Sequence, residues 1–467
     1  MGTLSSLMDL SRSALQSNQK ALAITSQNVA NQNVQGYTRQ TVNWSADVVS
    51  INGVAMGTGA RTGPEGISQR DRVLEQRVQQ QTQVSSAATA RESALTQMQS
   101  VFGLSSTSTS ALSTALGSSL DGLYNSFSAL ADAPSNAAAR QAVLHAAGAV
   151  AQAFQTASNQ IGSVRVGLAQ TAVGTVGAVN ALTKTIALLN QQIGASSPNT
   201  DAGGLEDQRQ AAIARLSQYV GLDQVTTESN GMTLSTSDGT VLVSGNQSFA
   251  LSVTASGSGV QITGAGSSTD ISGSVTGGQL GGILSVLKTD LPALTGSLDQ
   301  LAFAMGTAMN QQSALGLDAN GSAGTALFTL PATAAGAAGS IALAITDPSL
   351  VAAAGAGEGI AGNTNANALA AQANGALVSG QSASNFYTSM LSQLGGSVSG
   401  AKADSAAGQA SLAQLTTQRN ALSGVSLDEE AASLTSYERS YQAGAKLFAI
   451  VNTIFEAAIN LGTATTV

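Results

Sequence analysis

The chain has 467 residues, more than one hydrophobic core usually holds, so we expect two or more folding units. Only 3% of the residues are aromatic and 9% are charged, whereas glycine occurs 51 times, so long helices in close contact suit this composition better than a compact aromatic core. A net charge of -8, thinly spread basic residues and the lack of cysteine argue against nucleic acid as a partner and exclude disulfide bonds and thiol chemistry.

The first thirty residues are predicted to form an amphipathic helix with a narrow apolar seam that needs a partner helix. The segment has no basic start or cleavage site, and no run of eighteen apolar residues occurs, so we expect neither a cleaved secretory signal nor membrane insertion. The helix should stop within "SQNVANQNVQGYTRQ", residues 26–40, where Gly36 suits a left-handed cap. The seam consists of Leu4, Met8, Leu15, Leu22 and Val29.

The middle of the chain alternates between helical and strand patterns. Residues 44–66 are rich in glycine and are predicted to be irregular and to contain short strands. Helical periodicity then covers about residues 67–102 and 137–194, and the second of these helices is much longer than is typical of globular proteins. Alternating apolar and polar residues with Asn-Gly and Asp-Gly turns predict an antiparallel β unit over 221–275.

Leucines spaced by four and three residues predict a further helix from Leu280 to Met305, with a kink or break at Pro292. Residues 316–350 are predicted to be loop and strand, returning to the β unit. The last helix should start after Ser426, which with Glu429 forms a capping box. Its seam consists of Leu434, Tyr441, Phe448 and Phe455, spaced by seven residues.

These patterns predict a mainly α fold with a β insertion, elongated and multi-domain, whose amphipathic ends lie side by side as coiled-coil helices. The β unit would form an outer antiparallel domain. The predicted domains are an inner terminal-helix domain (1–40 and 424–467), a long-helix bundle domain (41–220, 276–315 and 361–423) and an outer β domain (221–275 and 316–360).

Candidate catalytic and metal-binding residues are few. His145 is the only histidine and lies in an alanine-rich helical segment, so we interpret it as a plain helix residue. The stretch "DANGSAGTALFT" from Asp318 lacks the glycine and glutamate of a calcium loop, and "GEGIAG" from Gly357 lacks the strand and helix of a dinucleotide site, so a turn and a flexible linker are expected. No cofactor or metal is predicted.

Two sets of polar residues near the terminal helices have more than one possible role. Asp428, Glu429 and Glu430 face different sides of one helix, so capping and complementing the helix dipole explain them better than a metal site does. Tyr37 and Arg39 are either parts of a solvated turn or docking residues that orient the next segment or meet a neighbour.

Both ends of the chain resemble a known family. "NVANQNVQGYTRQ", residues 28–40, and "GVSLDEEAASLTSYERSYQAGAKLFAIVNTIFEAAINL" from Gly424 look like the terminal signatures of the flagellar rod, hook and hook-associated proteins. The segments "LEDQRQAAIARLSQYVGL" and "GLDANGSAGTALF" make the chain most similar to the members at the junction of hook and filament.

The resemblance implies a structural subunit, not an enzyme, that is exported through the flagellar type III apparatus and assembles outside the cell. Its implied partners are further copies of itself, the hook protein, a second junction protein (FlgL) and an export chaperone (FlgN). The two apolar seams would be the assembly interface, and Asn31, Gly36, Tyr37 and Arg39 would mark the turn out of the inner helix.

Two alternatives remain. The chain could be a hook or rod subunit of the same family. Less in keeping with the patterns, it could be a secreted stalked adhesin or a glycan-acting enzyme, which would need an acid pair in the β unit. The acids available between residues 221 and 275 are Asp223, Glu228, Asp238 and Asp270.

Overall fold

The computed structural model describes residues 2–34, 36–51, 54–103, 115–195, 203–226, 232–256 and 259–463. The chain is mainly helical, with small antiparallel sheets, as predicted. It divides into two compact units, which we call the terminal unit (Met1–Val84, Ala178–Leu251 and Gly408–Val467) and the central unit (Ser85–Gly177 and Ser252–Ala407).

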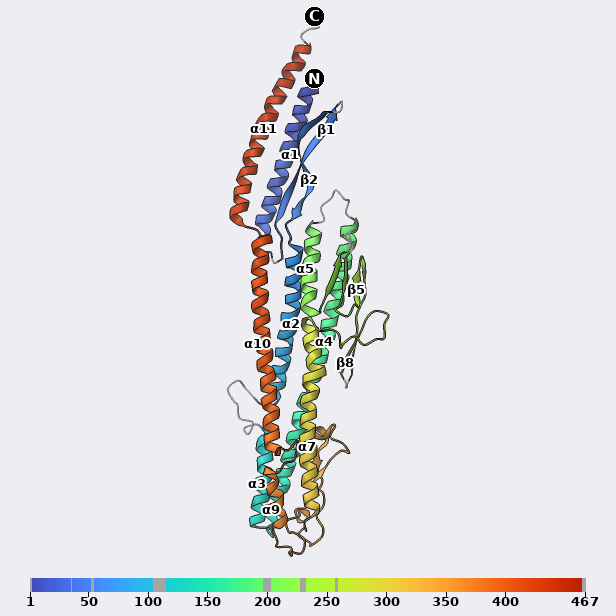
Figure 1. The fold of residues 1–467 in the computed structure, drawn as a ribbon, viewed down its shortest axis with the longest axis vertical. Helices are drawn as coiled ribbons and strands as arrows, with labels where there is room; N and C mark the ends of the chain where they lie inside the picture. The colour runs from blue at the N-terminus through green and yellow to red at the C-terminus, as the bar shows by residue number, and fades with distance from the viewer. Residues whose placement is uncertain are drawn as a thin grey trace. The chain divides into compact units, whose positions relative to one another are not determined.

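The helices and strands follow one another in the order that Figure 1 labels. The α-helices are α1 (Gly2–Asn31), α2 (Arg72–Val101), α3 (Ala115–Asp132), α4 (Ala137–Ala195), α5 (Gly203–Tyr219), α6 (Gly278–Ser285), α7 (Leu291–Ala314), α8 (Ala337–Ser340), α9 (Thr364–Ala371), α10 (Ala383–Ser423) and α11 (Leu427–Thr463). The strands are β1 (Gln40–Ile51), β2 (Val54–Ser68), β3 (Asp223–Thr226), β4 (Met232–Ser235), β5 (Val241–Ser244), β6 (Gln247–Ser248), β7 (Ser252–Ser256), β8 (Gly259–Thr263), β9 (Phe328–Thr329) and β10 (Ala342–Leu343).

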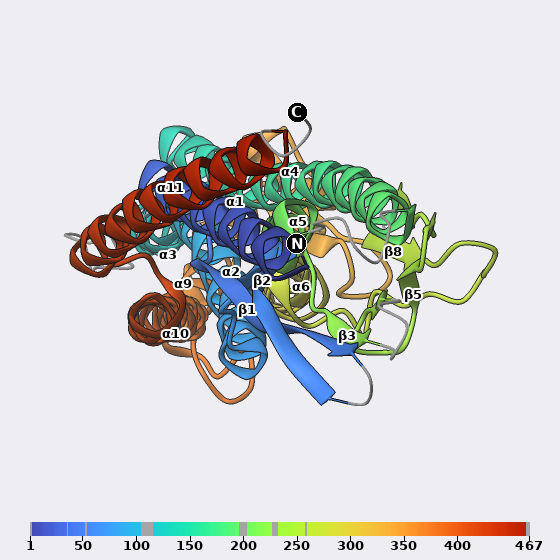
Figure 2. The same cartoon turned by 90° about the horizontal axis from the view of Figure 1, so that it is seen from above.

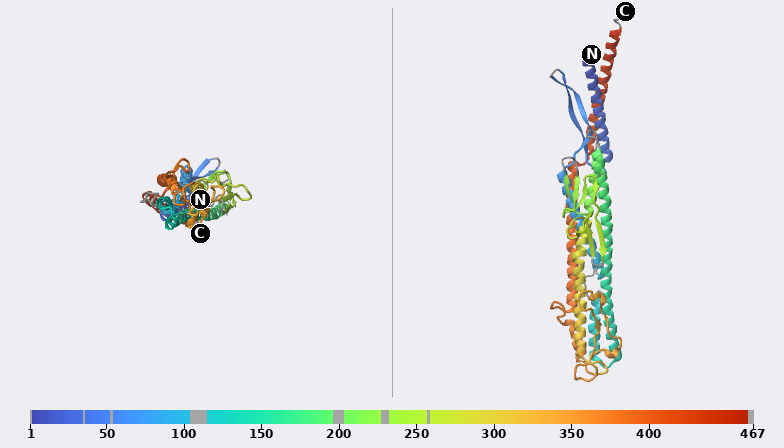
Figure 3. Two further views of the ribbon diagram at one scale, coloured as in Figure 1. Left: turned by 90° about the horizontal axis from the view of Figure 1, so that it is seen from below. Right: turned by 90° about the vertical axis from the view of Figure 1, so that its right-hand side faces the viewer.

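In the terminal unit, α1 and α11 lie side by side and run antiparallel (Figures 1 and 2). The start of α1 and the end of α11 therefore lie at the same end of this unit (Figure 3). Gly444 of α11 faces Leu15 of α1, and a β-carbon at Gly444 would lie 3.4 Å from the Leu15 side chain. A small residue at this point lets the two helices approach closely, and the predicted pairing of the terminal helices is confirmed.

A long hairpin, β1–β2, packs against α1 where the sequence predicted an irregular segment. Its two strands pair antiparallel with register shifts between Val42 and Trp44 and between Asp47 and Val48. Trp44 also contacts Tyr437 of α11, with ring centroids 6.2 Å apart. The glycines of β2 lower its strand propensity, but pairing with β1 and support from α1 compensate for this. The hairpin therefore packs mainly with the terminal helices, and β2 also contacts α5.

The strands predicted over 221–275 form two sheets, a four-stranded sheet of order β3-β4-β5-β6 and a separate pair β7-β8. The turn at Asp238-Gly239 is confirmed, because Gly239 has a φ of +87° between β4 and β5. The Asn230-Gly231 turn and Glu228 lie outside the described residues. Within the terminal unit, Asn180 of α4 exchanges hydrogen bonds with both backbone groups of Leu251, which ties the end of the four-stranded sheet to the helix.

The leucine-rich helix of the central unit is interrupted as predicted at Pro292. One π-helical turn, Val286–Asp290, separates α6 from α7. Proline has no amide hydrogen and clashes with the carbonyl four residues earlier, and a wider turn relieves both problems.

The expectation that residues 316–350 return to the β unit is wrong. Strands β9 and β10 pair with one another and pack on α7. Asn310 of α7 exchanges hydrogen bonds with both backbone groups of Phe328, and the carboxylate of Asp299 accepts from the amides of Gly336 and Ala338. Polar side chains of a helix thus hold these short strands, which an apolar pattern cannot reveal.

Helix α4 matches its predicted range and has 59 residues. Among the described residues it is the one helix long and apolar enough to cross a membrane, judged by length and composition only. Core helices of soluble proteins pass the same test. Buried residues such as Phe154, Ile161 and Ile186 give α4 a packed face, which is what a core helix requires.

Candidate assembly site

The end of α1 is fixed by one buried asparagine. Asn28 is 1% exposed, and its amide group donates to the backbone oxygen of Gln40 (2.8 Å) and to the carboxylate of Glu430 (3.1 Å). Its side-chain oxygen accepts from the Gln40 amide and from the hydroxyl of Tyr37, both at 3.0 Å. Asn28 therefore joins α1, the following turn, the start of β1 and the start of α11.

Arg39 forms the second link between the two ends of the chain. Its guanidinium group contacts Glu430 at 2.7 Å and Glu429 at 2.5 Å, and its backbone amide donates to the carbonyl of Ser423. The Glu430 side chain is only 2% exposed, so this charge is neutralised inside the protein. The two glutamates lie in the first turn of α11, as a favourable helix-dipole contact requires, but here they also bind Arg39.

Arg39 and Tyr37 thus orient the next segment of their own chain and are not parts of a solvated turn. Burial raises the pKa of the Tyr37 hydroxyl, as expected for a phenol held in this junction. Gly36 has a φ of +88°, which confirms the predicted left-handed position after α1. Asn31 is the last residue of α1, and its carbonyl accepts from the amide of Val34.

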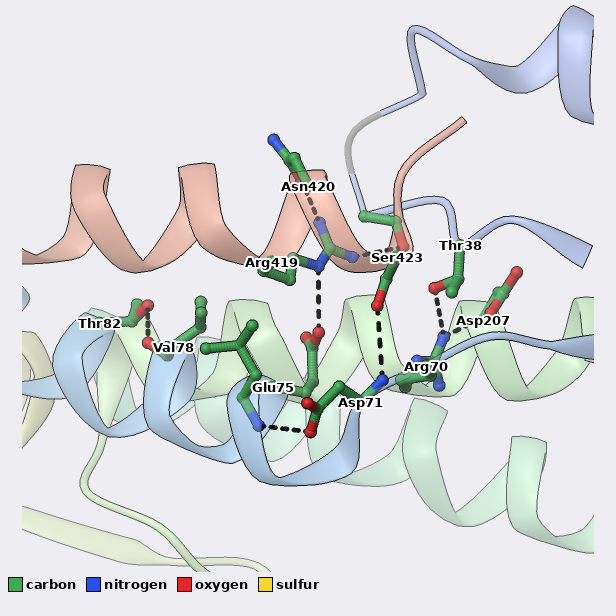
Figure 4. A network of polar contacts seen from close by, with 12 residues as sticks. Thr38, Arg70, Asp71, Glu75, Val78, Thr82, Asp207, Arg419, Asn420 and Ser423 are labelled. Carbon is green, nitrogen blue, oxygen red and sulfur yellow. Dashed lines mark hydrogen bonds and ion pairs between the residues drawn. The ribbon is translucent and has the colours of Figure 1, made fainter. Parts of the chain in front are cut away.

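A second polar cluster connects the start of α2 to the end of α10 (Figure 4). Arg419 contacts Glu75 at 3.1 Å and donates to the carbonyl of Gly36 at 2.9 Å. Asp71 caps α2 by accepting from the amides of Val73 and Leu74, each at 3.0 Å. These bonds satisfy amide groups that a helix start otherwise leaves without partners.

Arg70 binds Asp207 of α5 and also the hydroxyl of Thr38 (Figure 4). Burial raises the pKa of the Asp207 carboxyl above its ordinary value, and the neighbouring Arg70 offsets only part of this rise. Charged side chains within the terminal unit therefore join four segments, which are the turn after α1, the start of α2, helix α5 and the end of α10.

The predicted seam residues of α1 and α11 are only partly covered. Met8, Leu15, Leu22 and Val29 are half-buried, and the side chain of Leu4 lies outside those described. On α11, Leu434, Phe448 and Phe455 are half-buried, and Tyr441 is 38% exposed. Contacts within one chain thus cover much of the surface that was predicted to bind neighbouring copies.

A neighbouring apolar row on α11 is left open. Leu447, Ile450 and Ile454 are 47%, 60% and 49% exposed. Their spacing of three and four residues places them on one face of the helix. We call these three residues the open row. The sequence contains this row beside the predicted seam, but only the structure shows which of the two rows α1 covers.

Asn28, Glu430 and Arg419 were not predicted as site residues. Of these three residues, Asn28 was the one that could have been identified, because it lies at helical spacing from Ser17, Ala21 and Ile24, which are buried on the same face of α1. A polar residue on a buried face calls for partners. Its partner Glu430 is 402 residues away, and no spacing rule connects the two.

The other candidate residues have local roles. His145 is exposed and contacts Gln141 on its own helix, as expected for a plain helix residue. Asp318 accepts from the amides of Asn320 and Ser322, which makes the predicted turn. Glu358 accepts from Gly355 and Thr364, so the "GEGIAG" segment is an ordered turn and not a flexible linker.

The acids of the β unit also serve their own turns. Asp238 accepts from the hydroxyls of Thr236 and Thr240, and Asp270 accepts from the amides of Ile262 and Ser272. Across the described part of the chain, no three histidine or acidic side chains gather in a way that could hold a metal ion.

Family models match three parts of the chain. The flagellar hook-associated protein FlgK helical domain matches residues 95–328. The flagella basal body rod protein model matches residues 8–38, and the flagellar basal body rod FlgEFG protein C-terminal model matches residues 418–461. The last two segments contain most of α1 and α11, the helices that meet in the structure.

Curated relatives carry the same family name. Flagellar hook-associated protein 1 of Escherichia coli K12 is 29% identical over 342 residues, which is 70% of this chain and 60% of the relative. The Bacillus subtilis protein of that name is 32% identical over 244 residues, or 50% of this chain and 47% of the relative. The match therefore spans 60% or less of the length of these relatives.

A solved structure has the same fold. The flagellar hook junction protein FlgK from Burkholderia pseudomallei aligns with a TM-score of 0.66 at 18% identity, over 74% of this chain and 99% of that one. The FlgK model alone covers half of the sequence. The chain belongs to the FlgK family of flagellar hook-associated proteins.

Proposed function

We propose that this protein is a structural, self-assembling subunit of the bacterial flagellum that forms part of the junction between hook and filament. The observation that carries the proposal is the antiparallel α1–α11 pair with its open row of Leu447, Ile450 and Ile454. The names of the relatives and the match to the FlgK helical domain support the same role.

The open row is the surface on which neighbouring copies would pack. Covering a Leu or Ile side chain fully contributes about 1.5–3 kcal/mol, and roughly half of each of these side chains is still exposed. The three together would therefore contribute on the order of 2–5 kcal/mol per subunit if a neighbour covered them. Because α11 has little other cover, its helical form would be stabilised further by assembly.

The polar junction would set the direction in which this surface is presented. Asn28, Arg39 and Glu430 fix the start of α11 against the end of α1, and Arg419 fixes α10 against the intervening turn. We propose that α1, α11 and the β1–β2 hairpin act together as the inner assembly element. The long helices and the β strands would then form its outer parts.

The partners that follow from this role are further copies of the chain, the hook protein and a second junction protein (FlgL). Export from the cytoplasm through the flagellar type III apparatus, with the chaperone FlgN, would precede assembly outside the cell. The open row would then be a surface that a chaperone covers before export. No enzymatic activity is part of the proposal, and the match of residues 95–328 favours a junction subunit over a rod or hook subunit.

The test replaces Ile450 by aspartate, with Ala449→Asp as the matched control at an exposed position on another face of the same helix. Both variants are expected to fold and to be exported. Ile450→Asp should abolish swimming and leave hooks without filaments in electron micrographs, because a carboxylate cannot be buried without a partner. The Ala449→Asp strain should swim. Normal filaments with Ile450→Asp would contradict the proposal.

A further inference from the structure

A polar cavity of about 200 Å³ lies within the terminal unit, between the first turns of α2, helix α5 and strands β3 and β4. Its walls carry three arginines, four glutamines, two glutamates and one methionine. The residues that matter for its chemistry are Arg70, Arg72, Gln79, Arg209, Glu75 and Glu206. The assembly surface proposed above uses none of these side chains.

Three buried hydrogen-bond donors at this cavity have no partner among the described residues. They are the side-chain amide nitrogen of Gln79 and the Nε atoms of Arg209 and Arg70. Gln79 is 6% exposed and Arg209 is 7% exposed, so bulk water does not reach most of either side chain. A buried donor without an acceptor costs about 1–3 kcal/mol, and such groups are rare in folded proteins.

Both arginines are held in place by other atoms of their guanidinium groups. Arg209 donates through Nη1 to the side-chain oxygen of Asn190 at 3.0 Å. Arg70 is held by Asp207 and Thr38 (Figure 4). The free Nε donors of Arg209 and Arg70 therefore belong to anchored side chains, as expected of a prepared binding site.

The charges at the cavity favour an anion. Glu75 is neutralised by Arg419, and Asp207 by Arg70. Among the lining residues, Arg70, Arg72 and Arg209 carry three positive charges and Glu75 and Glu206 carry two negative charges, which leaves one positive charge in excess. Arg72 is exposed and Arg209 is buried, so the cavity has one cation on the solvent side and one inside.

We propose that this cavity binds a small oxyanion, a phosphate or carboxylate group, whose oxygens accept hydrogen bonds from Gln79 and Arg209 and whose charge is balanced by Arg72. Arginine suits this task because its planar group presents several donors to oxyanions. A water molecule occupies about 30 Å³ of liquid, so 200 Å³ holds such a group together with some water. Burial lowers the pKa of Arg209, and a bound anion would offset that effect.

The test is a calorimetric titration of the purified full-length protein with sodium phosphate and, separately, with sodium acetate, at an ionic strength kept constant with sodium chloride. We expect saturable binding with a Kd at or below about 1 mM. Arg72→Gln should weaken binding at least about tenfold, because it removes a charge-assisted contact. Arg77→Gln is the control: Arg77 is an exposed arginine on the same helix that does not line this cavity.

A second variant separates binding from folding. Gln79→Met keeps the size of the side chain but removes the buried amide, so it should abolish phosphate binding and raise the Tm of the phosphate-free protein. Binding of phosphate alone would indicate a free ion as the ligand, whereas binding of acetate as well would indicate the carboxylate of another protein chain. No saturable heat with either anion, or an equal loss of affinity in Arg77→Gln, would overturn the proposal.

Discussion

Replacing Asn28 by alanine is the sharpest perturbation of the junction between the chain ends. Four hydrogen bonds are lost, two to Gln40 and one each to Tyr37 and Glu430. Gln40 is 5% exposed and Glu430 is 2% exposed, so their freed groups stay largely out of reach of bulk water. At about 1–3 kcal/mol for each unsatisfied buried group, and with some relief from water that enters, we expect a loss of about 3–5 kcal/mol in the free energy of unfolding.

Urea unfolding followed by circular dichroism measures this loss, and amide hydrogen exchange at Gln40 locates it. The matched control is Asn18→Ala, because Asn18 lies on the same helix and its side chain only bonds back to the carbonyl of Ala14. That variant should change the free energy of unfolding by less than about 0.5 kcal/mol. Equal, small effects of the two substitutions, with an unchanged exchange rate at Gln40, would refute the role assigned to Asn28.

Two further predictions concern charged groups. The pair Arg39→Gln and Glu430→Gln, alone and combined, should give a coupling energy of about 1–3 kcal/mol by urea unfolding, and purely additive effects would contradict the ion pair. Hydrogen bonds from Thr364 and Gly355 hold the pKa of Glu358 below its ordinary value of 4.5, so its contribution to stability is present above that pH and is lost as the pH falls through the folded-state pKa. The Tm advantage of the native protein over Glu358→Gln should therefore be full at about pH 6 and should shrink below about pH 4, and an advantage that grows in acid would contradict this assignment.

The helices could be predicted because apolar residues repeat along them. Burial on one side of a helix imposes an apolar period of 3.6 residues. The regular leucines from Leu280 to Met305 therefore indicated α6 and α7, and the aromatic residues of the last helix indicated α11. The interruption of the helix before Pro292 could also be predicted, because proline has no amide hydrogen to donate within a helix. The β1–β2 hairpin was not predicted, because glycine in β2 hides the alternation and α1 supplies the support from another part of the chain.

Much less of the site could be predicted. The sequence indicated Gly36, Tyr37 and Arg39 as a turn, since the glycine and the asparagines before it disfavour a helix. It did not indicate that Arg39 meets Glu429 and Glu430, because contacts between residues nearly 400 positions apart follow no period. The same limit applies to the exposed side of α11: Leu447 and Phe448 are neighbours in sequence, and only the position of α1 decides which of them remains open.

The central claim is that the open row of α11 is covered by neighbouring subunits in the flagellum. The chain has no cysteine, so a single cysteine can be placed and probed without interference. Ile450→Cys should react fast with a maleimide in the purified monomer and at least about tenfold more slowly in isolated hook-filament junctions, whereas His145→Cys, at an exposed position of the central unit, should react at similar rates in both. Equal reactivity of Ile450→Cys in the monomer and in the assembled junction would contradict the account.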